Sequence, residues 1–92
     1  MDNSKQKHDF LERNQAIFWH FDKSKLDKLP DDIIVEYILN YGNLNDVKEL
    51  FSILGIKEVA NIFFKNTLNR KRTNYLPEVS NFFTLYFKRN AH

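Results

Sequence analysis

Three histidines are the side chains of this 92-residue chain best suited to binding a transition metal, since it has no cysteine. His8 lies in a polar start, His20 in an aromatic stretch and His92 at the last position. Protein metal sites need His, Cys or carboxylate ligands at recognisable spacings, and these histidines have none. We therefore expect neither a metal ion nor another cofactor.

Acid–base catalysis would need carboxylates that share a cleft. Asp31, Asp32 and Glu36 cluster, but they follow Pro30 at an expected helix start, where carboxylates stabilise the positive end of the helix dipole. The four serines lie outside any nucleophile-elbow motif, and two glycines are too few for a phosphate-binding loop. We expect that the protein is not an enzyme.

Positive charge gathers in the carboxyl-terminal part of the chain. Residues 1–55 carry a net charge of −3 and residues 56–92 carry +5, giving +2 for the whole chain. The densest cluster is Arg70, Lys71 and Arg72. Such cations can contact phosphate or an acidic partner. Alternatively, these three residues form a solvated loop that binds nothing.

A helix-turn-helix motif would be a second indication of DNA binding. Gly55 and Ile56 fit its turn, but Phe51 is bulky where the two helices cross, and Asn61 is polar where the second helix needs an apolar anchor. DNA binding through residues 65–72 and 88–89 therefore rests on charge alone.

Aromatic residues make up 15% of the chain. Phe18, Trp19 and Phe21 can form a docking surface or pack in the core. We predict that Trp19 is buried in the monomer, because Phe18 and Phe21 surround it. The candidate interaction residues are Phe18, Trp19, Phe21, Arg70, Lys71 and Arg72.

Hydrophobic periodicity predicts the helices that position these residues. Residues 1–9 are expected to fray, and a short helix over about 9–15 and a tight turn within 22–29 should follow. The clearest helices are expected over about 30–41, 44–54, 56–67 and 76–89, with Pro30 and Pro77 at their starts. Gly42 and Gly55 should both cap helices with positive φ.

The same spacing predicts which side chains face inward. In the helix over 30–41 the expected inward residues are Ile34, Tyr37, Ile38 and Tyr41, and in the last helix Phe82 belongs to a wide apolar face. Strand-like alternation does not persist anywhere. The prediction is an all-α fold: one domain over residues 10–92, a bundle of about four helices with an aromatic N-terminal arm.

No apolar run approaches the roughly 20 residues of a membrane span, and the start is too polar for a signal peptide. A cytoplasmic location without membrane contact is expected, and the lack of cysteine agrees with a reducing compartment.

Several segments resemble a known family. They are Phe18-Trp19-His20-Phe21-Asp22, Leu26-Asp27, Ile38-Leu39-Asn40-Tyr41-Gly42 and Ser80-Asn81-Phe82-Phe83. Over about residues 17–87 the chain is similar to small bacterial helical proteins often encoded beside AbiEii-type nucleotidyltransferase toxins of abortive-infection systems. The sequence departs from that pattern at His20, where an acidic residue is usual, and at Tyr37, where arginine is usual.

Because such proteins are often encoded beside these toxins, the resemblance implies an antitoxin-like or accessory role by association. Its shared residues are aromatic, aliphatic and turn residues and none is catalytic, so they inform on the fold more than on an activity. The leading hypothesis is a non-enzymatic protein-interaction module with a protein partner, for which the resemblance suggests such a toxin. The alternative is a small DNA-binding or autoregulatory protein that uses the basic C-terminal half. A third hypothesis is a helical domain with an unrecognised activity. The sequence does not indicate the oligomeric state.

Overall fold

All regular elements of the computed structural model, which describes residues 3–68 and 74–91, are helical. They are α1 (Asn3–Arg13), the 3-10 helix η1 (Lys23–Lys28), α2 (Asp31–Tyr41), α3 (Leu44–Leu54), α4 (Ile56–Thr67) and α5 (Pro77–Asn90). The expected all-α class is confirmed.

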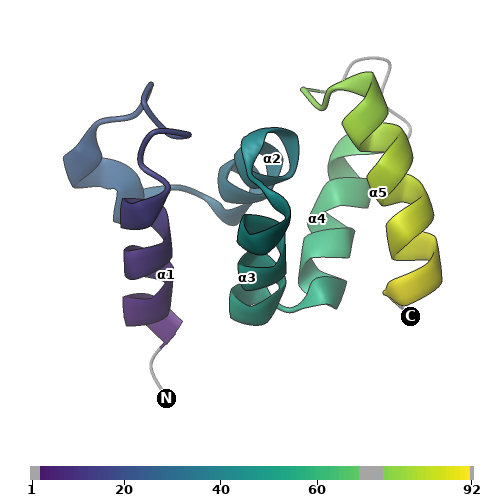
Figure 1. The fold of residues 1–92 in the computed structure, drawn as a ribbon, viewed down its shortest axis with the longest axis horizontal. Coiled ribbons are helices and arrows are strands. Elements are labelled where there is room, and N and C mark those ends of the chain that lie inside the picture. Colours follow the sequence, from purple (N-terminus) through teal and green to yellow (C-terminus); the bar gives the residue numbers. More distant parts are fainter. Residues whose placement is uncertain (1–2, 69–73, 92) are drawn as a thin grey trace.

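The helices form an open row. Figure 1 shows α1, α3, α4 and α5 side by side along the longest axis of the molecule, with α5 at one end of the row. α2 packs on both α3 and α4, α1 packs on η1 and α3, and α5 packs on α4. The radius of gyration is 12.9 Å, close to the value of about 12 Å for a compact folded chain of this length.

Local signals explain the helix boundaries in the middle of the chain. Pro30 precedes α2, and Asp31 and Asp32 occupy its first turn. At the start of α3, Asn43 and Asp46 form a capping box: the Asp46 backbone N–H donates to Asn43 Oδ1 at 2.8 Å, and the Asn43 N–H donates to Asp46 Oδ2 at 2.9 Å. These boundaries lie within a residue of those predicted.

The core is aliphatic and aromatic. Its buried side chains come from every element, and the largest fully buried ones are Phe10, Phe18, Phe63 and Phe87. Phe63 lies at its centre, with ring centroids of Tyr75 at 5.0 Å and Phe87 at 5.4 Å. No polar or charged residue among those described is buried.

The amino-terminal part is more regular than the sequence suggested. The described residues hold five α-helices and η1 rather than about four helices, and α1 begins at Asn3, within the stretch expected to fray. Long-range contacts account for this: Phe10 and Leu11 are buried, and Lys7 Nζ forms an ion pair with Asp31 at 2.9 Å. The expected turn within 22–29 is present as η1, which buries Leu26.

Gly42 differs from its prediction. Gly55 has φ +89°, as expected, but Gly42 has φ −76° and ψ 158°, which is extended backbone. The Gly42 N–H still donates to Ile38 O at 2.8 Å and ends α2. Glycine is needed there for space, because a Cβ would lie 2.7 Å from that same oxygen.

None of the helices among the described residues has the length and apolar character that crossing a membrane requires.

Candidate protein-interaction surface

The segment between α1 and η1 places neighbouring aromatic residues in opposite environments. Hydrogen bonds between residues three apart, Ile17 N–H to Asn14 O at 2.9 Å and Phe21 N–H to Phe18 O at 3.0 Å, fold it into successive turns. Phe18 is 1% exposed, whereas Trp19 is 73% exposed. The prediction that Trp19 is buried is therefore wrong: the turns point Phe18 into the core and Trp19 away from it.

Tyr37 of α2 holds this segment. Its ring stacks on Phe18 with centroids 5.6 Å apart and meets Phe21 at 5.5 Å, near a right angle. Phe21 is half-buried. Of the three aromatic residues predicted as a docking surface, Phe18 and Phe21 thus anchor the segment and Trp19 is presented to solvent.

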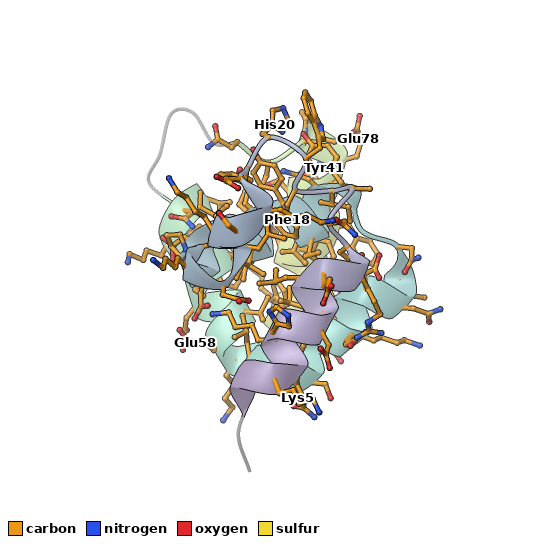
Figure 2. All side chains as sticks on the ribbon, turned by 90° about the vertical axis from the view of Figure 1, so that its left-hand side faces the viewer. Lys5, Phe18, His20, Tyr41, Glu58 and Glu78 are labelled. Atoms are coloured by element: carbon orange, nitrogen blue, oxygen red, sulfur yellow. The ribbon has the colours of Figure 1, made fainter. Side chains whose placement is uncertain are left out.

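Trp19 forms one wall of an open cavity of about 440 Å³, which we call the Trp19 cavity. That volume is within the range of about 300 to 1,000 Å³ typical of ligand sites. Its lining comes from the turn segment and from α2: Ala16, Ile17, Trp19, His20, Tyr37 and Tyr41. In Figure 2, His20 and Tyr41 lie at one end of the molecule, above Phe18, and Lys5 lies at the other.

Tyr37 and Tyr41 reach the cavity because the buried face of α2 is rotated from the predicted one: Ile34 and Ile38 are buried as predicted, but the two tyrosines are not. Its buried residues are Ile34, Val35, Ile38 and Leu39, so the inward face is entirely aliphatic. Tyr41 is 59% exposed and Tyr37 is half-buried. If the buried stripe of α2 had been taken as purely aliphatic, Tyr41 would have been predicted at the surface and Tyr37 at the edge of the core.

The residues that line the cavity include no lysine, arginine, aspartate or glutamate. Residues 14–22 and 29–47 contain no lysine or arginine, and their acidic residues are Asp22, Asp31, Asp32, Glu36 and Asp46. The amide and hydroxyl of Ser24 donate hydrogen bonds to Asp22 and lower the pKa of that carboxyl group. Asp31 is paired with Lys7 and Glu36 accepts a hydrogen bond from Asn74, so these carboxylates are engaged by other parts of the chain.

A second apolar surface lies on the outer face of α5. Phe83 and Phe87 face the core, whereas Phe82 and Leu85 are exposed, contrary to the predicted inward place of Phe82. The ring of Tyr86 stacks between those of Phe82 at 6.0 Å and Phe51 at 5.9 Å. Exposed apolar side chains on one helix face are typical of an interface.

His8 belongs to a network of carboxylates between α1 and η1. Its Nδ1 lies 2.7 Å from Asp27 Oδ1, and its Nε2 lies 3.3 Å from Glu12 Oε2. The hydrogen bond and charge of Asp27 raise the pKa of His8, with smaller contributions from Glu12 and Asp9. His8, Asp9 and Glu12 offer ligand atoms within 4.8 Å of one another, but all three are exposed. The arrangement suits a protonated imidazole between carboxylates.

The basic cluster Arg70, Lys71 and Arg72 lies outside the described residues. The cations that were expected to extend it, Lys65, Lys88 and Arg89, are exposed on α4 and α5. Lys65 lies in the last turn of α4, whereas Lys88 and Arg89 lie in the last turn of α5, at the opposite end of that helix from residue 74.

No family model, no curated protein and no solved structure matches this chain. Its function must therefore be inferred from the surface itself.

Proposed function

We propose that this protein is a non-enzymatic protein-interaction module that docks on a partner protein through the Trp19 cavity. The exposed Trp19 carries the proposal. Tryptophan is among the residues most enriched at interaction hot spots, because it buries a large area with few rotatable bonds. Leaving its ring in water at 73% exposure has no benefit for folding.

The anchoring of the segment supports the same function. Phe18 and Phe21, on either side of Trp19 in the sequence, hold the backbone through ring contacts with Tyr37, with centroids 5.6 and 5.5 Å apart. A docking residue on a fixed support loses little conformational entropy when it binds. The outer face of α5, with Phe82 and Leu85, is a separate exposed apolar surface, and it shares no lining residue with the Trp19 cavity.

A finer version of the proposal is that the partner is a nucleotidyltransferase toxin and that the protein acts in the cytoplasm as its antitoxin or accessory. That version rests on the family resemblance described above and on association, since a fold does not define a function. An adjacent nucleotidyltransferase gene would give it independent support.

Co-purification from the source organism tests the proposal. Tagged full-length protein, Trp19→Ala and Leu68→Ala would be compared after nuclease treatment. Leu68 is a matched control, because it is an apolar residue of 57% exposure that does not line the cavity. We expect Trp19→Ala to reduce recovery of a specific protein at least about tenfold, as loss of a hot spot does, and Leu68→Ala to leave it unchanged. Recovery that is independent of Trp19, or recovery of nucleic acid alone, would contradict the proposal.

A further inference from the structure

The outer face of α5 carries a stripe of exposed side chains with opposite charges at its two ends. Its members follow one another at intervals of four, three and four residues: Glu78, Phe82, Leu85 and Arg89. At about 100° of rotation per residue, all four side chains lie within about 60° of one another on the helix. Phe82 is 57% and Leu85 is 64% exposed, so two apolar residues stand between an acid and a base.

The other face of α5 attaches the helix to the molecule and leaves this stripe uncovered. Phe83 and Phe87 are buried where α5 packs on α4, with ring centroids 6.4 and 5.4 Å from that of Phe63. α5 lies at one end of the helix row (Figure 1). Within the described part of the chain, neither Glu78 nor Arg89 belongs to an ion pair, so both charges are available to a partner.

The order of the stripe makes it complementary to itself. Its spacing is the same in both directions along the helix. A second copy laid antiparallel about a two-fold axis therefore places its Arg89 opposite Glu78 and its Leu85 opposite Phe82. Opposite charges then meet at both ends of the stripe and apolar side chains meet at its centre. A parallel arrangement would instead bring like charges together at both ends.

We propose that the outer face of α5 binds a second copy of this chain as an antiparallel, two-fold symmetric helix pair. The carboxyl-terminal half of α5 carries an open cavity of about 290 Å³ whose lining residues are Phe82, Leu85, Tyr86, Arg89 and Asn90. In the pair, Phe82 of the second copy lies opposite this half and enters the cavity. The two pairs of Glu78 with Arg89 form the polar rim around this apolar centre.

The small size of this surface implies weak association. α5 has 14 residues and is therefore about 21 Å long. A contact between two such helices is expected to bury less than the roughly 1,200 Å² at the lower limit for stable complexes. We expect a reversible dimer with a dissociation constant between about 1 and 100 µM, measured by sedimentation velocity of the full-length protein.

Charge reversal tests the antiparallel register. Glu78→Arg brings like charges together at both ends of the pair, and so does Arg89→Glu. Each variant alone should dimerise at least about tenfold more weakly than the native protein, because each reversal acts twice in a symmetric dimer. A mixture of the two variants restores opposite charges at both ends, so it should form heterodimers with an affinity near that of the native dimer.

Substitution at the centre of the stripe gives a second measurement. Leu85→Ala should raise the dissociation constant about tenfold, because it removes apolar contact area from both copies. Leu44→Ala is the matched control, since Leu44 is 65% exposed but lies on α3. This control should dimerise as the native protein does, and circular dichroism would verify that every variant is folded.

Several outcomes would overturn the inference. They are a native protein that stays monomeric at about 1 mM, charge variants that each dimerise as the native protein does, and a mixture that associates no more tightly than its components. Equal effects of Leu85→Ala and Leu44→Ala would also contradict it.

The dimer and the proposed docking function can fail independently. The cavity on α5 shares no lining residue with the Trp19 cavity, so Trp19→Ala should leave the dimer intact. Loss of the dimer in Trp19→Ala would assign self-association to the Trp19 cavity and overturn the role of α5. Recovery of a different protein through Trp19 tests the docking function alone.

Discussion

Phe18 and Trp19 are neighbours with opposite roles, and their substitution should separate folding from docking. Phe18→Ala removes a buried ring and should lower the free energy of unfolding by about 3 to 5 kcal/mol. Trp19→Ala removes an exposed ring and should change it by no more than about 0.5 kcal/mol. Urea unfolding followed by far-UV circular dichroism measures both.

Tryptophan fluorescence provides an independent check. Because Trp19 is largely exposed, the folded protein should show the red-shifted emission of a tryptophan in water. Blue-shifted emission, or a loss of stability in Trp19→Ala close to that of Phe18→Ala, would show that the ring is buried after all.

His8 should make stability depend on pH. Its pKa is raised above the ordinary value of 6.5, first by the hydrogen bond to Asp27. The stabilisation from this ion pair is therefore complete below that ordinary value and is lost as pH rises through the higher folded-state pKa. Asp27→Asn should lower the pKa of His8 and remove this part of the pH dependence.

Proton NMR titration of the His8 ring measures that shift, and urea unfolding across the same pH range measures the stability. Glu12→Gln is the comparison, because Glu12 contributes less than Asp27 to the raised pKa of His8. If the pKa of His8 is the same in Asp27→Asn as in the native protein, the His8–Asp27 ion pair does not form in solution.

At the residue level, the sequence indicated that some aromatic rings are buried and others exposed, but it did not predict which ring faces inward. The abundance of aromatic residues indicated a core with some exposed rings, but three aromatic residues within four positions do not show which one faces inward. That choice depends on the turns between Asn14 and Phe21 and on the position of Tyr37 in α2. Both are set by packing between segments distant in sequence.

The two glycines illustrate how one residue type serves two kinds of helix end. Gly55 has φ +89°, a backbone conformation that side chains rarely adopt, and Gly55→Ala should cost about 1 to 3 kcal/mol through strain. Gly42→Ala should also cost about 1 to 3 kcal/mol, because its Cβ would collide with the backbone oxygen of Ile38.

Urea midpoints of the two variants, with Ser52→Ala on the exposed side of α3 as a control, test this prediction. The control should differ from the native protein by no more than about 0.5 kcal/mol. A Gly55→Ala variant as stable as the control would show that α3 and α4 can be joined without the positive φ.

Among the elements, α2 to α5 could be located closely from the sequence. Pro30, Asn43 with Asp46, Gly55 and Pro77 are local signals that act through neighbouring backbone groups. α1 has no such signals in its first turn, where acidic residues are absent. Its ion pair with Asp31 and its buried Phe10 join it to residues far along the chain, so periodicity alone missed its start.

The whole molecule should be a poor ligand for duplex DNA. Its net charge is only +2, and the helix-turn-helix pattern does not fit its sequence. We expect sequence-independent binding no tighter than about 10⁻⁴ to 10⁻⁶ M at physiological salt. Replacing Arg70, Lys71 and Arg72 with glutamine should reduce the salt slope by up to about three.

Fluorescence anisotropy of labelled duplexes at several salt concentrations measures this affinity. Nanomolar, sequence-specific binding by the isolated protein would instead favour the DNA-binding alternative and its basic C-terminal half.

The short connections in the helix row have a kinetic consequence. Only Gly42 and Asn43 separate α2 from α3, and only Gly55 separates α3 from α4, and each pair of neighbours packs together. Chains dominated by contacts between residues near in sequence pass a small entropic barrier and fold in about microseconds to milliseconds. Stopped-flow or temperature-jump relaxation should therefore show one rapid phase, so the protein can regain its docking surface almost as soon as it is released from a denatured state.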